Sequence, residues 1–264
     1  MSVTQRLSRA VSFIRRYQFL LYELTRRDFK KRYRRSYLGS LWSVVTPFLT
    51  MMILYMVFSN LFGRSIENYA LYLICGQLFY SFYGDGTSRA LESIISNRRL
   101  IRKVSLPRLL FPLSITITSG LYFVYSLPAI FLLVFIMKGG LNPQCLLVVV
   151  PVILLFVFVL GVGILLSALT VRFRDLVHLY KIFLRALRYG TPLFYPETIV
   201  PDKYRFIIDC NPLYYYIRSF RELMYYDTSP TWSLMAICAV LSGVSLLFGI
   251  YVFKKQQGCF ALNI

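Results

Sequence analysis

The sequence has few acidic residues and few charged residues of any kind. Of its 264 residues, 11 are Asp or Glu and 30 are Lys or Arg, so 16% are charged while the formal net charge is +19. Hydrophobic residues make up 57% of the chain, against about 45–50% in an ordinary soluble domain. No Asp, Glu, Lys or Arg occurs in five long stretches, at Ser36–Gly63, Asn68–Gly84, Leu109–Met137, Gly139–Val171 and Thr228–Phe253. A soluble globular fold is therefore excluded.

Residues that catalyse reactions or bind metals are also scarce. There is one histidine, and there is no G-x-x-x-x-G-K-[ST] segment that would bind the phosphates of ATP. The five cysteines lack C-x-x-C spacing, which argues against a zinc site and a disulfide framework and predicts small buried hydrophobes instead. Asp85 and Asp175 are the acids near membrane depth, and they lie at the ends of apolar stretches. We predict no catalytic residue, metal site or cofactor in this chain.

The apolar stretches predict membrane spans, because a helix needs about 20 residues to cross a bilayer. Lys and Arg favour the cytoplasmic side of a membrane, so their distribution between the stretches predicts the orientation. The leader, two alternate connecting segments and the tail hold 22 of them, whereas the other segments hold six. Both termini are thus expected in the cytoplasm, which requires an even number of crossings. We assign the sixth span to 176–195, although it contains four basic side chains, His178, Lys181, Arg185 and Arg188.

The expected fold is a single all-α transmembrane domain over residues 1–264, with six transmembrane helices in the cytoplasmic (inner or plasma) membrane. The predicted spans are 37–62, 69–88, 109–137, 145–171, 176–195 and 231–253. Residues 1–36 form a cytoplasmic leader, 89–108 a cytoplasmic segment and 196–229 an extracytoplasmic segment. The leader is too long and too charged for a cleaved signal peptide, so the first span is expected to remain in the mature protein.

The leader has the pattern of a helix that lies in the membrane interface. Its apolar residues Leu7, Val11, Ile14, Leu21 and Leu24 recur at helical intervals. A basic and aromatic run follows, and its charges include Arg26, Arg27, Lys30, Lys31 and Arg32. In one interpretation this run serves solely to anchor the chain to anionic lipid headgroups, and each basic residue contributes about 1 kcal/mol to that binding. Alternatively, it also meets the headgroup of an anionic lipid-linked substrate.

Two connecting segments combine features that predict short helices. Residues 94–103 mix basic Arg98, Arg99, Arg102 and Lys103 with apolar Leu100 and Ile101, which indicates an amphipathic helix before Pro107. Basic residues that only set the membrane topology would not explain the apolar residues, so the pattern favours docking of this segment to another surface. Between the prolines of 196–229, helices are predicted at 203–209 and 213–226, the second containing Tyr214, Tyr215, Tyr216 and Phe220. These rings fit an aromatic belt at the membrane interface, or alternatively a gate that stacks on sugars.

Two helix faces are candidates for a substrate path. Phe48, Tyr55 and Phe62 recur every seven residues in the first span, although ordinary helix packing explains this stripe equally well. In the fifth span the four basic residues lie along one helix face, so Arg185 and Arg188 are predicted to line a hydrated path. The alternative is that these cations pair with Asp85 or with carbonyls of a neighbouring helix.

Several blocks of the sequence resemble a known family, the membrane subunits of type-2 ABC exporters that move lipid-linked polysaccharides such as O-antigens, capsules and teichoic acids. The blocks are residues 24–33 followed by 36–42, residues 94–103 with Pro107 and Pro112, residues 172–176, and residues 191–221 with their Thr191-Pro192, Asn211-Pro212-Leu213 and Phe220-Arg221 elements. They span most of the chain in the expected order. The basic residues in the fifth span depart from the apolar helix expected in relatives.

The resemblance implies a half-transporter that forms a homodimer and binds two copies of a separate ATPase subunit, which would hold ATP and Mg²⁺. It implies that 94–103 is the coupling helix. We predict that Leu100 and Ile101 insert into the ATPase, with Arg98, Arg99 and Arg102 at the rim. The resemblance also places the leader where the lipid-linked substrate enters and makes the two short helices an outer gate. No appended carbohydrate-binding module is expected after Ile264.

The predicted function is therefore ATP-driven export of a lipid-linked polysaccharide or polyol phosphate. A drug or lipid exporter of the same group is one alternative, and the aromatic content of 17% favours the sugar conduit over it. A membrane-embedded glycosyltransferase or phosphotransferase is the alternative from another class, but no carboxylate pair or histidine cluster supports it. Because the basic residues follow membrane topology, no nucleic-acid partner is expected; the partners are the ATPase, a second copy, the glycan and membrane lipids.

Overall fold

The structure is a computed structural model that describes residues 3–32, 36–63, 66–104, 106–140 and 142–257, without the side chains of residues 3–14 and 40. Every regular element within these ranges is a helix, which confirms the expected all-α fold. The α-helices are α1 (Val3–Arg32), α2 (Trp42–Phe62), α3 (Tyr69–Ser96), α4 (Arg98–Lys103), α5 (Leu110–Lys138), α6 (Val149–Arg172), α7 (Leu176–Gly190), α8 (Asp202–Asp209), α9 (Pro212–Met224) and α10 (Trp232–Gln256). Short 3₁₀ helices, η1 (Gly39–Leu41), η2 (Pro143–Val148) and η3 (Glu197–Ile199), precede α2, α6 and α8.

Four helices are long and apolar enough to cross a membrane: α2, α5, the continuous segment Pro143–Arg172 formed by η2 and α6, and α10. They match the predicted spans 37–62, 109–137, 145–171 and 231–253, except that α2 begins at Trp42 after η1. Most of their residues are not buried inside the chain, as expected for side chains that face lipid. The chain is therefore a multi-pass integral membrane protein.

Helix α3 lies at the centre of the bundle, in contact with α2, α5, α6, α7 and α9. It does not end at residue 88, where the predicted span 69–88 stops, but continues to Ser96. Its polar side chains make it less apolar than the four membrane-crossing helices. Because most of its residues are buried against neighbouring helices, the surrounding helices replace lipid as its environment.

Helix α7 is shorter than the predicted span 176–195, which is wrong in extent. The helix ends at Gly190 after 15 residues, and residues 191–195 have no regular structure. Pro192 restricts Thr191 to the extended conformation that it adopts, with φ −106° and ψ 134°. At 1.5 Å per residue α7 is about 22 Å long, less than the roughly 30 Å of a hydrocarbon core.

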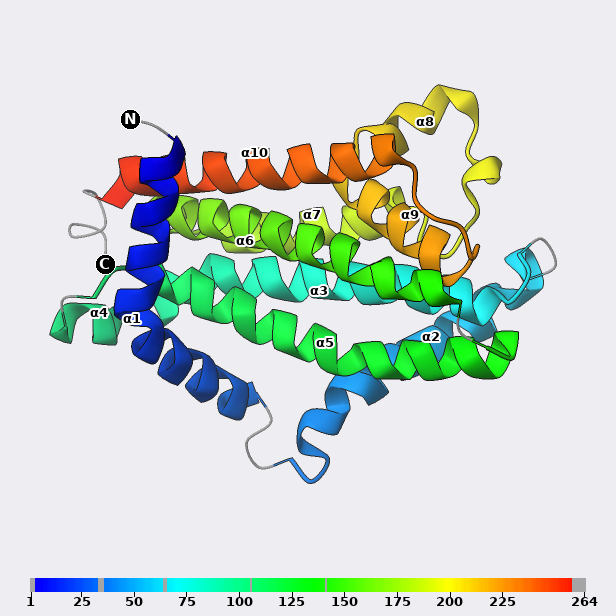
Figure 1. Ribbon diagram of the computed structural model, residues 1–264, viewed down its shortest axis with the longest axis horizontal. Coiled ribbons are helices and arrows are strands. Elements are labelled where there is room, and N and C mark those ends of the chain that lie inside the picture. Colours follow the sequence, from blue (N-terminus) through cyan, green and yellow to red (C-terminus); the bar gives the residue numbers. More distant parts are fainter. Residues whose placement is uncertain (1–2, 33–35, 64–65, 105, 141, 258–264) are drawn as a thin grey trace.

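The long helices run side by side along the longest axis of the molecule (Figure 1). The leader α1 lies across one end of the bundle, near α4 and the last turn of α10, whereas α8 and α9 lie at the opposite end (Figure 1). The main core is rich in aromatic residues and joins α3 to α9. Phe79 and Phe220 are both fully buried there, with ring centroids 4.3 Å apart.

The most extensive contact between two helices joins α6 and α10 through small residues. Gly161 and Gly249 lie opposite each other, so close that a Cβ atom added to Gly249 would lie 2.3 Å from the carbonyl oxygen of Gly161. Ser242 of α10 donates a hydrogen bond of 2.7 Å to the carbonyl oxygen of Leu154 on α6. Small residues at such contacts let helix backbones approach closely in membranes.

The cysteines follow the prediction of burial in three of the four described cases. Cys75 and Cys238 are 0% exposed and Cys145 is 5% exposed. Cys210 is exposed between α8 and α9, where the prediction is wrong, and Cys259 lies outside the described residues.

Candidate functional site

The leader α1 is fixed to the bundle by an apolar contact at its C-terminal half. Leu24 is 4% exposed and packs against Leu110 and Phe111 at the start of α5. Burying one leucine contributes about 1.5–3 kcal/mol. Three further residues of α1 pack on this contact, namely Tyr17, Leu20 and Leu21. The predicted amphipathic helix thus has a protein-facing side; its residues Leu7, Val11 and Ile14 lie outside the described side chains.

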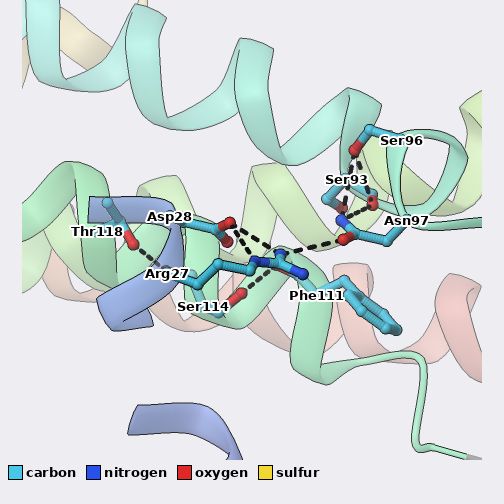
Figure 2. Close-up of polar contacts among 8 residues, drawn as sticks. All are labelled: Arg27, Asp28, Ser93, Ser96, Asn97, Phe111, Ser114 and Thr118. Carbon is cyan, nitrogen blue, oxygen red and sulfur yellow. Dashed lines mark hydrogen bonds and ion pairs between the residues drawn. The ribbon is translucent and has the colours of Figure 1, made fainter. Parts of the chain in front are cut away.

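A polar network joins α1 to the corner between α3 and α4 (Figure 2). Arg27 donates two hydrogen bonds to Asp28 Oδ1, of 2.9 and 2.8 Å, and a third of 3.0 Å to Asn97 Oδ1. Asn97, the residue between α3 and α4, donates to the carbonyl oxygen of Ser93 at 2.8 Å. The network therefore connects α1 directly to the junction of α3 and α4.

The last residues of α1 meet a carboxylate in the middle of α3. Asp85 Oδ2 lies 2.6 Å from Arg32 Nη1 and 3.8 Å from Arg89 Nη1, and it accepts a 2.9 Å hydrogen bond from Ser119. The Arg32 guanidinium also lies 4.4 Å from the ring centroid of Tyr122 on α5. The Asp85 carboxylate is thus paired with arginines of α1 and α3 and hydrogen-bonded by α5.

We predict that Asp85→Asn loosens α1 from the bundle, because Arg32 and Arg89 then lose the opposite charge between them. Charged hydrogen bonds of this kind contribute about 1.5–3 kcal/mol each. The variant should unfold at lower temperature in detergent, and trypsin should cut faster at Arg26, Lys30 and Lys31. Asp202→Asn is the matched control, since its pair with Arg205 is 3.9 Å long and almost fully exposed. Equal cleavage of the two variants would contradict this role of Asp85.

Three further basic residues at the C-terminal end of α1, namely Arg26, Lys30 and Lys31, are exposed. Arg26 lies 3.6 Å from Glu23, and both side chains are about half exposed. Lys30 and Lys31 are also exposed, whereas Tyr33, Arg34 and Arg35 lie outside the described residues. Of the five leader cations predicted to meet a headgroup, Arg27 and Arg32 are thus bound within the chain and three face outward.

Helix α4 presents two different faces. Arg98, Arg99, Arg102 and Lys103 are exposed, as expected for a rim. Leu100 and Ile101 are half-buried and pack on α1 and α5 of the same chain. The predicted amphipathic helix over 94–103 is in fact interrupted at Asn97, and Ile94 is fully buried as part of α3. The sequence pattern is confirmed, but its apolar side faces the bundle.

The cations of α7 do not pair with Asp85, which is held by Arg32, Arg89 and Ser119. Arg188 donates a 3.1 Å hydrogen bond to the side-chain carbonyl of Gln77 on α3 and lies 5.7 Å from the ring centroid of Tyr80. Arg188 thus bonds a carbonyl group of a neighbouring helix, as the alternative had it, and Asp85 is not its partner. The other basic residues of this face, His178, Lys181 and Arg185, are exposed.

The aromatic stripe of α2 is mixed in its surroundings. Phe48 and Phe62 pack partly buried against the main core, and the ring centroids of Phe62 and Phe58 lie 6.1 Å apart. Tyr55 is 44% exposed, with its ring centroid 6.0 Å from that of Tyr69 on α3. The structure thus brings one side of the stripe into the helix bundle and leaves Tyr55 accessible.

The predicted outer helices correspond to α8 and α9, and most aromatic residues of α9 are buried. Tyr216 and Phe220 are 0% exposed, and the Tyr216 hydroxyl donates a 2.9 Å hydrogen bond to the carbonyl oxygen of Cys238. Tyr215 donates to the carbonyl oxygen of Asp209 at 2.8 Å. Tyr214 donates to Glu197 Oε2 at 2.7 Å. Burial and this hydrogen bond raise the pKa of Tyr214, so its phenol remains a donor.

Arg221 is a buried charged residue that was not among the predicted site residues. It was counted as a charge of an outer loop, but it is 3% exposed and clamps residues 192–193. Its Nη1 and Nη2 donate to the carbonyl oxygens of Pro192 and Leu193 at 2.7 and 2.8 Å. Its guanidinium lies 3.5 Å from the ring centroid of Tyr72 on α3. Helical spacing offered a signal, because Arg221 follows Tyr214 and Ile217 on the buried face of α9.

Comparison with known proteins identifies the family. Residues 19–225 match the ABC-2 type transporter family. An O-antigen export system permease protein RfbA from Klebsiella pneumoniae is 32% identical over 245 residues, which cover 92% of this chain and 93% of that protein. The Myxococcus xanthus RfbA is 29% identical over 260 residues, covering 97% and 99% of the two chains. The polysialic acid transport protein KpsM from Escherichia coli is 20% identical over 238 residues, covering 88% and 91%. The chain therefore belongs to the ABC-2 type transporter family.

Proposed function

We propose that this chain is the membrane half of an ATP-driven exporter that translocates a lipid-linked polysaccharide or polyol phosphate across the cytoplasmic membrane. The observation that carries the proposal is the similarity to O-antigen export permeases over almost the full length of both chains. The similarity to a polysialic acid transport protein extends the support to a second glycan.

In this proposal six helices cross the membrane, with both termini in the cytoplasm. The four apolar helices are joined by α3, which its neighbours shield from lipid, and by α7 with the extended residues that follow it. The basic residues of α1 and α4 support placing their end of the bundle in the cytoplasm. Helices α8 and α9 then lie on the outer side, as a gate.

The proposed assembly is a homodimer with two ATPase subunits, which hold the ATP and Mg²⁺. Substrate would first meet the exposed Arg26, Lys30 and Lys31, and then a path lined by α2 and by Arg185 of α7. The exposed basic face of α4 suits an acidic surface on the ATPase, while Leu100 and Ile101 hold α4 on the bundle. The Arg27–Asn97 contact supports a mechanical connection from the ATPase to the leader.

We expect the double substitution Arg98→Glu and Arg99→Glu to reduce co-purification of the ATPase at least tenfold in detergent, because it reverses the charge of the docking face. Rim charges mainly set association rate and salt sensitivity, so the wild-type complex should also weaken as salt rises. The control is Lys254→Glu with Lys255→Glu, the same charge change at the nearby end of α10. Undiminished co-purification with the α4 variant would contradict docking through this face.

An export assay tests the proposed function as a whole. A strain that lacks its own O-antigen permease and ATPase would be complemented with this chain and its cognate ATPase, and surface glycan would be measured on intact cells with a lectin. Glycan should reach the surface with the active ATPase and remain inside when the phosphate-binding lysine of the ATPase is replaced by Ala. Surface glycan that is absent although both proteins are produced would favour another substrate class.

A further inference from the structure

A cavity of about 410 Å³ lies at the outer end of the molecule, between α9, the first turn of α3 and the segment around η3. This volume falls within the roughly 300–1,000 Å³ of small-molecule sites. The residues that matter for its chemistry are two tyrosines, two arginines and two glutamates: Tyr72, Tyr226, Arg218, Arg221, Glu197 and Glu222. None of them was predicted as a site residue from the sequence.

Three of the four charged residues of the cavity belong to one connected set of hydrogen bonds, and the fourth, Arg221, binds backbone carbonyls. Arg218 Nε lies 3.2 Å from Glu222 Oε1, and Arg218 Nη1 lies 3.1 Å from the Tyr214 hydroxyl. That hydroxyl donates in turn to Glu197 Oε2. Two carboxylates and two guanidinium groups thus face one small space without a net charge. A phosphate or an acidic sugar in this site would lie near both carboxylates, so it would gain little electrostatic free energy on binding.

Two buried polar atoms of this cavity have no hydrogen-bond partner in the described part of the chain. They are Arg221 Nε, a donor, and Glu222 Oε2, an acceptor. Arg221 is 3% exposed, and its two terminal nitrogens are occupied by the carbonyls of Pro192 and Leu193. Buried polar groups are almost always hydrogen-bonded. A ligand hydroxyl could donate to the Glu222 carboxylate once that side chain turns toward the cavity.

The cavity also offers an apolar surface. One face of the Tyr72 ring is covered by Arg221, while Tyr226 is 57% exposed. The ring of Tyr226 is held edge-on by Tyr225, at a centroid distance of 4.7 Å. A rigid aromatic ring beside hydrogen-bonding groups suits a molecule with both C–H faces and hydroxyl groups, which describes a sugar ring.

We propose that this cavity binds a neutral, hydroxyl-rich sugar residue, in which the Glu222 side chain turns to accept from a hydroxyl and Tyr226 contacts the ring. The proposal rests on the proposed function, because the sugar would belong to the exported glycan as it leaves the membrane at the outer end. The site would hold the emerging chain briefly and favour forward movement.

Saturation-transfer NMR on the full chain in lipid nanodiscs tests the proposal. The probes are galactose, mannose, glucuronate and inorganic phosphate, each tested separately. At least one neutral hexose should receive saturation from wild-type protein. Glu222→Gln should weaken its binding about tenfold, the loss expected when a charged hydrogen bond is removed. Tyr226→Ala should weaken it to a similar extent, because the ring contact is lost. Tyr204→Ala is the control, because Tyr204 is a half-exposed ring of α8 outside the cavity.

Several outcomes would overturn the proposal. They are binding of phosphate or glucuronate in place of both hexoses, hexose binding that is unchanged in both variants, or no hexose binding at all. Tyr226→Ala removes an exposed ring, so it remains informative if Glu222→Gln does not fold. If glycan is exported in the cell assay but no hexose binds in the NMR experiment, the sugar site is refuted and the proposed function stands. Hexose binding that depends on Glu222 and Tyr226, without export, would support the site and contradict the proposed function.

Discussion

Gly161→Val should prevent α6 and α10 from packing and lower the free energy of unfolding by about 3 kcal/mol or more. A Cβ atom added at Gly161 would lie 2.4 Å from the backbone nitrogen of Leu246 and 2.5 Å from the carbonyl carbon of Ser245. Because these are backbone atoms, no side-chain rotation can relieve the contact. The two helices must separate, and the Ser242 hydrogen bond to Leu154 must lengthen or break.

The matched control for this change is Gly243→Val on α10. A Cβ atom at Gly243 meets nothing within 4 Å, so the same substitution should be tolerated. The unfolding temperature in detergent and the amount of folded protein after size-exclusion chromatography measure both variants. Similar stability of Gly161→Val and Gly243→Val would show that α6 and α10 are not held this closely.

Arg221→Met should have the second large effect, because it leaves the carbonyl oxygens of Pro192 and Leu193 buried without their donors. Each unsatisfied buried group costs about 1–3 kcal/mol, so the loss for the two carbonyls should be about 2–6 kcal/mol. Gly76 on α3 makes room for the guanidinium, since a Cβ atom there would lie 2.7 Å from Arg221 Nη2. Arg221→Lys should lose less, because an ammonium can serve one carbonyl but lacks the planar fork.

The readouts are the unfolding temperature and export in the complemented strain. Arg205→Met on α8 is the control, because Arg205 is 67% exposed in its side chain and makes one long ion pair with Asp202. If Arg221→Met were as stable as Arg205→Met, the clamp on residues 192–193 would not contribute to the fold.

The sequence allowed prediction of elements whose causes are local. Uninterrupted apolar runs located α2, α5, α6 and α10. The two outer helices were predicted at 203–209 and 213–226 and are observed as Asp202–Asp209 and Pro212–Met224. Asn211 starts the second one by accepting a hydrogen bond from the backbone nitrogen of Leu213, and Pro212 occupies the first turn. These signals lie within a few residues of the helix ends they determine.

Features that depend on distant partners could not be predicted in this way. Asp85 of helix α3 pairs with Arg32, which lies more than fifty positions earlier in the chain. Leu100 and Ile101, which are predicted to contact a partner protein, pack in part on the leader and α5. Arg221 is buried because the carbonyls of residues 192–193 turn toward it. A count of charges along the sequence does not distinguish these buried or paired side chains from solvated ones.

Because Cys75, Cys145 and Cys238 are buried, a thiol reagent can label the unmodified protein selectively. Among the described cysteines, Cys210 is the exposed thiol, at the end of the bundle opposite α1 and α4. A maleimide that cannot cross membranes would therefore reach it in intact cells only if α8 and α9 face the exterior. Modification of Cys210 can be located by mass spectrometry of its peptide, without engineered residues, so the native chain itself reports its orientation in the membrane.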